Sequence, residues 1–131
     1  MKTLSDYTES LQTQLFHDTG AFFAFSTKQF YEKKEGGVKY KTMSHGLICP
    51  HDKVDELSEG LEQIIKQGIK EDLEENGKDA IIQRELGNYE CQITNDITDV
   101  IDALEDYGIT EAEIKEGYKL FFQKCIDNDW F

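Results

Sequence analysis

At 131 residues the chain has the length of one ordinary domain, and its 15 aromatic side chains argue against disorder. It carries 27 acidic and 14 basic side chains, a net charge of −13, which disfavours binding to nucleic acid or anionic lipid and favours basic proteins as partners. No apolar run approaches the ~20 residues of a membrane span, and no signal-peptide pattern is present. With three widely spaced cysteines, an odd number, we expect a soluble protein of the cytosol with reduced thiols and no membrane association.

The first half of the chain predicts one helix followed by short extended segments. Apolar residues at helical spacing predict a first helix that ends near Gly20: Leu4, Tyr7, Leu11 and Leu15. Residues 21–25 are aromatic-rich and predict a buried strand of about five residues. Ser26 or Thr27 then begins a short helix, or alternatively the chain forms a hairpin that turns at Gly36–Gly37. Further strand patterns cover residues 38–42 and 47–49 and stop at Pro50.

The second half predicts helices. A long stripe of apolar residues runs through residues 54–73 and stops at Asn76–Gly77, and a second helix covers residues 81–89. A third begins at Asn95 or Asp96 and ends at Gly108, and the capping box Thr110–Glu113 begins a fourth. We therefore expect a single α-rich α+β domain over residues 1–131, with a small antiparallel sheet from the N-terminal half covered by four C-terminal helices.

Three stretches of the sequence together carry a resemblance to a known family. They are residues 21–30 (AFFAFSTKQF), 81–91 (IIQRELGNYEC) and 94–114 (TNDITDVIDALEDYGITEAEI). The pattern resembles a family of small acidic proteins of bacteriophages and other mobile elements, whose function is not known. The resemblance implies a mobile-element setting, and it implies no activity and no site residues.

Acidic side chains are concentrated in one segment, because residues 96–116 hold eight carboxylates and one cation, Lys115. Asp99, Asp102 and Asp106 are spaced i, i+3, i+7, so they line one side of a helix. Acidic residues of the long helix follow a similar spacing. The candidate partner-binding residues are therefore Asp96, Asp99, Asp102, Glu105, Asp106, Glu59 and Glu62. Such faces also serve solubility alone, and that interpretation stays open.

These carboxylates predict a binding protein without catalysis. The partner expected is a basic host protein, and the mechanism is occlusion of a basic, nucleic-acid-binding surface of a host defence or nucleic-acid enzyme. In the most specific form of this hypothesis, the carboxylates mimic the phosphates of nucleic acid. We expect no direct binding of DNA or RNA and no cofactor. The terminal pair Trp130–Phe131 either folds back onto the core or serves as an exposed anchor for a partner.

A lysine-rich segment, interleaved with aromatic residues, offers a second surface. Its members are Lys28, Lys33, Lys34, Lys39 and Lys41 with Phe30, Tyr31 and Tyr40. Cations among aromatic rings suit nucleic-acid contact, but the net charge of the chain opposes it. Pairing with acidic residues of a second copy is the alternative, which would make this a homo-oligomeric structural protein.

A metal-binding or Cys/His enzyme is the alternative from another class. Its candidate residues are His45, Cys49, His51 and Cys91, which have the ligand types of zinc but the spacing of no common zinc finger. Residues 72–77 also match part of a calcium-binding loop, although Gln83 stands where that loop needs a bidentate carboxylate. Catalytic motifs such as Gly-x-Ser-x-Gly are absent, so an enzymatic function is not favoured.

Overall fold

A computed structural model describes residues 1–131, and the chain divides into two compact units, Met1–Gly68 and Ile69–Phe131. The boundary lies inside one continuous helix, α3 (Val54–Asn76). Seven α-helices and one small sheet make up the chain, so the helix-rich α+β class is confirmed. That residues 1–131 behave as one domain stays a prediction. No helix combines the length and the apolar character that a membrane span requires.

The N-terminal unit joins two helices to a three-stranded antiparallel sheet. Its elements, before the first turns of α3, are α1 (Leu4–Thr19), β1 (Phe22–Phe23), α2 (Thr27–Lys33), β2 (Tyr40–Thr42), η1 (Ser44–Gly46), β3 (Leu47–Pro50) and η2 (His51–Lys53). The strand order is β1-β3-β2, with Phe22 opposite Ile48 and Lys41 opposite Cys49. The core of this unit contains Leu47, Cys49 and Leu57, against which α1 and the start of α3 pack.

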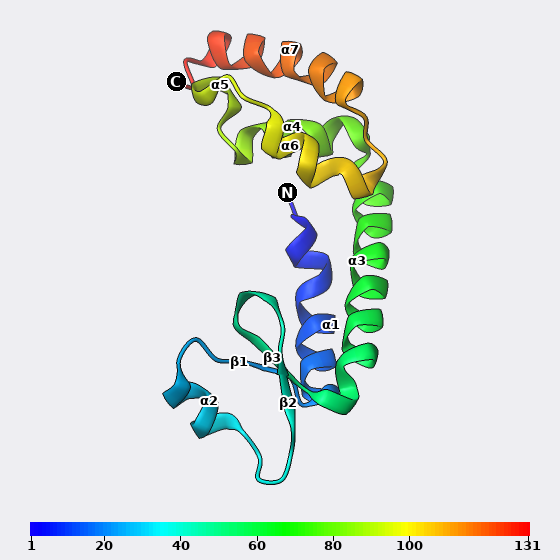
Figure 1. Ribbon diagram of the computed structural model, residues 1–131. Helices are drawn as coiled ribbons and strands as arrows, with labels where there is room; N and C mark the ends of the chain where they lie inside the picture. Colours follow the sequence, from blue (N-terminus) through cyan, green and yellow to red (C-terminus); the bar gives the residue numbers. More distant parts are fainter. The chain divides into compact units, whose positions relative to one another are not determined.

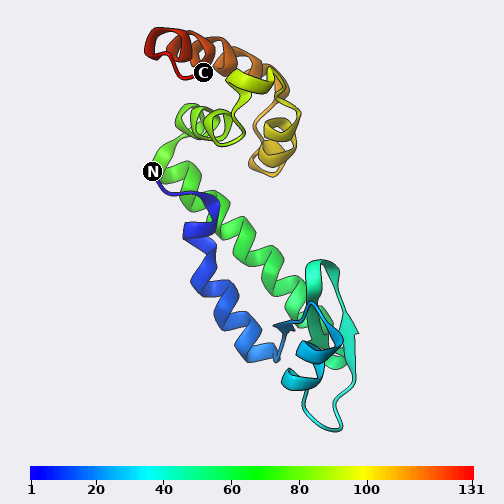
Figure 2. The same cartoon turned by 90° about the vertical axis from the view of Figure 1, so that its left-hand side faces the viewer.

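Helix α1 lies alongside the part of α3 that belongs to the N-terminal unit in both views of the ribbon (Figures 1 and 2). The approach is close because α3 has glycine at the two points of contact. A Cβ on Gly60 would lie 2.7 Å from Leu15 Cδ2, and one on Gly68 would lie 2.5 Å from Thr8 Cγ2. The glycines inside this helix therefore serve packing, which offsets their unfavourable helix propensity.

The expectation of a five-residue buried strand over residues 21–25 is wrong, because β1 contains only Phe22 and Phe23. The chain leaves the sheet at Ala24, and Phe25 is 74% exposed. Ser26 then caps α2, since its Oγ accepts a hydrogen bond from the Gln29 amide at 3.2 Å. The short helix is confirmed, and the alternative hairpin is wrong, because β1 and β2 both pair with β3.

The C-terminal unit is entirely helical. After the end of α3 it contains α4 (Lys78–Asn88), α5 (Cys91–Thr94), α6 (Thr98–Leu104), the 3₁₀ helix η3 (Glu105–Tyr107) and α7 (Glu111–Asn128). Its interior is formed by buried apolar side chains of α4, α6 and α7: Ile81, Ile82, Leu86, Val100, Leu104, Ile114 and Phe121. The capping box at Thr110 is present as predicted. The short helix α5 was not predicted.

Candidate protein-binding face

The charge of the chain is divided unequally between its two units. Residues 1–68 hold 10 acidic and 8 basic side chains, a net charge of −2, whereas residues 69–131 hold 17 acidic and 6 basic side chains, a net charge of −11. The acidic character of the protein therefore belongs almost entirely to its helical C-terminal unit. A net charge of this size creates a negative electrostatic potential around the unit.

Helix α6 and η3 present the predicted acidic residues to solvent. The side chains of Asp99, Asp102, Glu105 and Asp106 are exposed and form no ion pair. The opposite side of the same segment is apolar, with Val100 fully buried. Because the apolar side of α6 is buried, the carboxylates on its opposite side point toward solvent.

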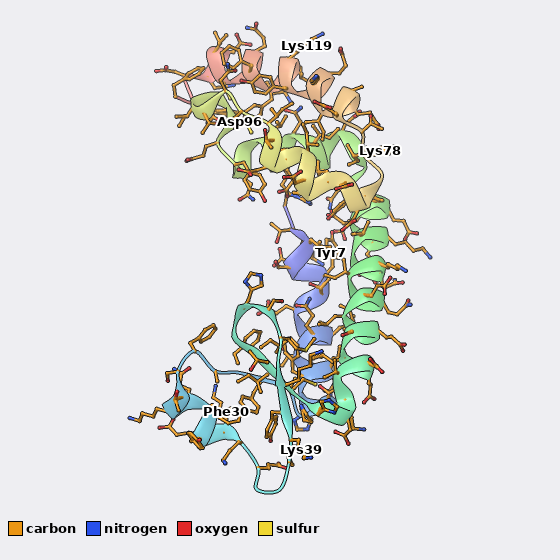
Figure 3. The ribbon with its side chains drawn as sticks, viewed as in Figure 1. Tyr7, Phe30, Lys39, Lys78, Asp96 and Lys119 are labelled. Atoms are coloured by element: carbon orange, nitrogen blue, oxygen red, sulfur yellow. The ribbon has the colours of Figure 1, made fainter.

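Asp96 lies just before the first turn of α6, and besides carrying charge it stabilises this end of the helix (Figure 3). Its Oδ1 accepts hydrogen bonds from the Thr98 amide at 2.9 Å and from the Thr98 hydroxyl at 2.6 Å. These bonds from Thr98 lower the pKa of Asp96, because they stabilise its charged form. The exposed carboxylate also carries negative charge at a helix N-terminus, which is the favourable end.

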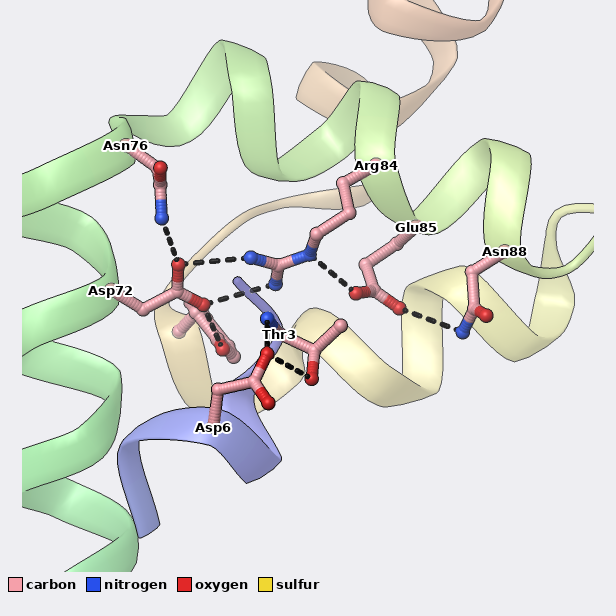
Figure 4. A network of polar contacts seen from close by, with 8 residues as sticks. Thr3, Asp6, Asp72, Asn76, Arg84, Glu85 and Asn88 are labelled. Atoms are coloured by element: carbon pink, nitrogen blue, oxygen red, sulfur yellow. Dashed lines mark hydrogen bonds and ion pairs between the residues drawn. The ribbon is translucent and has the colours of Figure 1, made fainter. Parts of the chain in front are cut away.

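A buried polar network holds η3 against α3 and α4 (Figure 4). The Tyr107 hydroxyl donates a hydrogen bond of 2.6 Å to Asp72 Oδ2, and Arg84 makes two hydrogen bonds to the same carboxylate. Asn76 donates to Asp72 Oδ1 at 2.8 Å, and Arg84 Nε contacts Glu85 Oε1 at 2.8 Å. Because Tyr107 directly follows Glu105 and Asp106 in the chain, this network positions the last two acidic residues of the face.

The pKa shifts of Asp72 and Tyr107 show how the groups of this network act on one another. Burial by itself would raise the pKa of Asp72, but hydrogen bonds from Arg84, Tyr107 and Asn76 and the charge of Arg84 outweigh burial and lower it. Burial, with the bond to the Asp72 carboxylate, raises the pKa of Tyr107. Asp72 is therefore a buried anion with a full set of donors, and it lies within α3 rather than in a calcium-binding loop.

The other two acidic candidates, Glu59 and Glu62, lie on the part of α3 that belongs to the N-terminal unit. Both are exposed, and Glu62 pairs with Lys66 at 3.1 Å, whereas Glu59 forms no ion pair. They belong to a different unit from α6, so we do not combine them with the carboxylates of α6 into one surface.

The four metal and Cys/His candidates are distributed over different environments. His45 and His51 are exposed, Cys49 is fully buried in the sheet, and Cys91 is fully buried in the other unit. Burial raises the pKa of both thiols, helped by Asp52 and Glu56 at Cys49 and by Asp96 and Asp99 at Cys91. No three His, Cys, Asp or Glu side chains are grouped as metal ligands. The thiolate form that a ligand or nucleophile needs is disfavoured at both positions.

The lysine-rich segment is partly used within its own unit. Lys33 Nζ donates a hydrogen bond of 2.7 Å to the Phe23 carbonyl, and the Lys34 ammonium lies 4.7 Å from the centroid of the Tyr31 ring. Phe30 packs against Tyr40, with ring centroids 5.7 Å apart. The ring of Phe30 thus belongs to an aromatic cluster of the fold (Figure 3).

The terminal aromatic pair folds back onto the C-terminal unit. The Trp130 amide donates to the Cys125 carbonyl at 3.0 Å, and the Phe131 ring packs on Phe122 with centroids 5.8 Å apart. Gln92 Nε2 also donates to the Trp130 carbonyl at 3.0 Å. Both aromatic side chains nevertheless stay exposed over more than half of their surface.

A family model matches residues 4–124. The chain belongs to the family of unknown function DUF7659. This membership agrees with the resemblance to a family without known activity, and it supplies no catalytic or binding residues. Comparison with curated proteins and with solved structures gave no match.

Proposed function

We propose that this member of DUF7659 acts by binding a protein with a basic surface, through the carboxylates that α6 and η3 present to solvent. The observation that carries the proposal is the set of exposed acidic side chains without cationic partners: Asp99, Asp102, Glu105 and Asp106. Like charges one helical turn apart destabilise a helix by roughly a few tenths of a kcal/mol per pair. A partner that supplies cations relieves this repulsion and so gains affinity.

Occlusion of a nucleic-acid-binding surface is the mechanism that we propose. Carboxylates one turn apart on a helix lie ~5–6 Å from each other and form a repeating array of negative charge. A groove that binds phosphates through lysine and arginine also attracts such an array. The resemblance to proteins of bacteriophages and mobile elements makes a host defence or nucleic-acid-processing enzyme in the host cytosol the partner class that we propose.

A pull-down that compares two charge-reversed variants tests this function. The first variant replaces Asp99, Asp102 and Asp106 by lysine, and the matched control replaces Glu74, Glu111 and Asp127 by lysine. Both variants change the net charge of the same unit equally, and all six residues are exposed. We expect a basic partner that is held by the wild type and the control at low salt, lost at high salt, and lost by the first variant.

The occlusion mechanism adds a second requirement. Duplex DNA or RNA added to the complex should release the partner, because it competes for the same groove. Equal retention by both variants rejects the proposed face. Retention that resists both nucleic acid and salt rejects occlusion of a nucleic-acid-binding surface.

A further inference from the structure

The ring of Phe25 is held in an exposed position on the N-terminal unit, and nothing in the proposed function uses it. The side chain is 74% exposed, more than any other large apolar side chain of the protein. Its ring stacks nearly parallel on Phe23, with 9° between the planes and centroids 6.2 Å apart. Gly46 leaves room for it, because a Cβ there would lie 2.5 Å from Phe25 Cε1. The Phe25 amide donates to Gln29 Oε1 at 2.7 Å. The fold therefore fixes a ring that it does not bury.

A second exposed ring, that of Tyr31, lies on helix α2. This helix lies on the face of the sheet opposite to α1 and α3 in both ribbon views (Figures 1 and 2). Phe30 faces the sheet, where its ring packs on Phe22 with centroids 6.3 Å apart. Tyr31, the next residue, is 61% exposed, and the Lys34 ammonium lies 4.7 Å from the centroid of its ring. Two aromatic rings of this region are thus open to solvent, six residues apart.

The segment that carries these rings is positively charged. Residues 22–41 contain five lysines and two glutamates, a net charge of +3. All five lysines are exposed, and none forms an ion pair. Lys33 donates one hydrogen bond to the Phe23 carbonyl at 2.7 Å, and its ammonium keeps two further donors. Lys28 stands three residues before Tyr31 and therefore lies on the same side of α2. Free cations thus accompany both rings.

The negative charge of the whole chain belongs mainly to the other unit. The expectation that the protein binds no DNA or RNA rests on the net charge of −13, but the N-terminal unit carries only −2 of it. Charges more than about 8 Å away are largely screened at physiological salt, so the lysines nearest to the rings dominate the potential there. The local charge therefore favours an anionic ligand.

We infer that this aromatic–lysine surface binds single-stranded nucleic acid. The surface consists of exposed aromatic and lysine side chains: Phe25, Lys28, Tyr31, Lys33 and Lys34. One base stacks on Phe25 and another on Tyr31, while the three lysines contact phosphates. A single strand supplies both flat rings and an anion at each nucleotide, whereas a duplex keeps its bases stacked inside and offers phosphates alone. The inference goes beyond the proposed function and does not depend on it, because it uses the other unit.

The probe is a fluorescent oligothymidylate of about ten nucleotides, titrated with the full chain and followed by anisotropy. Two competitors separate the contributions of ring and charge. A DNA duplex of the same length hides its bases, and polyglutamate carries negative charge without bases. We expect the single strand to bind at least about tenfold more tightly than either competitor. Three phosphate contacts predict that the logarithm of the association constant falls with the logarithm of salt concentration with a slope of about −2.

Two matched pairs of variants locate the site. Phe25→Ala and Phe131→Ala remove rings that are 74% and 60% exposed, but only Phe25 belongs to the surface. Lys28→Gln and Lys124→Gln each remove an exposed lysine without an ion pair, and Lys124 lies in the other unit. We expect Phe25→Ala to weaken binding by about tenfold and Lys28→Gln to make the salt slope shallower by about 0.7, whereas both controls bind as the wild type does.

Equal effects within a pair, equal binding of the duplex or of polyglutamate, or the absence of binding overturns the inference. Light scattering tests a second copy of the chain as the occupant. A dimer at low salt that Phe25→Ala abolishes and the oligonucleotide leaves intact would assign the surface to self-association and overturn the inference as well. All four variants change exposed side chains, so loss of folding does not decide the result. The proposed function is tested on α6 and fails or stands separately.

Discussion

Arg84 holds Asp72 through two parallel hydrogen bonds, Nη1 to Oδ1 at 2.9 Å and Nη2 to Oδ2 at 3.0 Å, where the Asp72 side chain has no exposure to solvent. Bidentate pairs of this kind are strong and directional. The pair joins the end of α3 to α4, and through the Tyr107 hydroxyl it also holds η3. This polar contact therefore links three elements inside the C-terminal unit.

Removal of the buried anion is expected to destabilise the protein strongly. Asp72→Ala removes the two hydrogen bonds from the Arg84 guanidinium and the acceptor of the Tyr107 hydroxyl. The free energy of unfolding should fall by about 3–5 kcal/mol. Urea unfolding followed by fluorescence measures the change. Glu62→Ala, which removes an exposed pair with Lys66, is the control and should cost less than about 1 kcal/mol. Similar losses in both variants would contradict a role for the buried pair.

Acid should remove the contribution of Asp72 to the free energy of unfolding. Burial opposes the charged form of this carboxyl, but the hydrogen bonds of Arg84, Tyr107 and Asn76 lower its pKa in the folded state below the ordinary value of 3.8. Its stabilising contribution is therefore fully present above that value and is lost as pH falls through the folded pKa.

The variant Asp72→Asn tests this pH dependence. The difference in unfolding free energy between wild type and variant should be constant from neutral pH to about pH 5 and should shrink below about pH 4. Urea unfolding at several pH values measures it. A difference that does not change with acid would show that the pKa of Asp72 is not lowered.

Substitution by alanine should destabilise the protein at one glycine of the C-terminal unit and stabilise it at another. Gly117→Ala places a Cβ 2.5 Å from Cγ2 of the buried Ile82, so the two helices must shift apart, and we expect a loss of about 1–3 kcal/mol. Gly87→Ala meets its nearest atom, Phe121 Cε1, at 3.8 Å and gains helix propensity, so a gain of up to about 1 kcal/mol is expected. Thermal unfolding of the two variants checks the order, and a stabilising Gly117→Ala would show that the helices are less tightly packed.

The three cysteine thiols should resist modification in the native protein. Cys49, Cys91 and Cys125 are free and fully buried, and burial raises the pKa of each thiol above its ordinary value of 9.0. Both effects keep the reactive thiolate scarce. Reaction with a chromogenic disulfide reagent at pH ~8 should therefore be slow and become fast in urea. Rapid labelling of one thiol without denaturant would identify a reactive cysteine and revive the Cys/His alternative.

The acidic face follows from sequence reasoning, but the buried network does not. Asp99, Asp102 and Asp106 are close in the chain, and their spacing alone places them on one side of a helix. Asp72 and Arg84 are 12 residues apart, and Tyr107 lies 35 residues from Asp72, so only packing brings them together. One signal was available. Arg84, the only arginine in the sequence, stands between Ile81 and Leu86 near the apolar stripe of its helix.

The close approach of α4 and α7 at Gly117 is not predicted by any local pattern in the sequence. Gly117 lies inside a predicted helix, where the sequence alone shows only a residue of low helix propensity. Its role in packing depends on Ile82 of another helix. The hydrogen bond from Gln83 Nε2 to the Gly117 carbonyl likewise joins two helices that are far apart in the chain. Both features depend on the distance between two helix axes.

The sequence by itself determined the longer helices, the capping box at Thr110 and the concentration of charge, because helix periodicity, capping boxes and side-chain charge are local properties. Tertiary structure decided the short length of β1, the strand order β1-β3-β2 and the boundary between the two units inside α3. Strand partners and core contacts join residues far apart in the chain, and their free energy depends on which apolar surfaces are buried together. The strand partners and core contacts therefore depend on the whole fold, and no local sequence pattern predicts them.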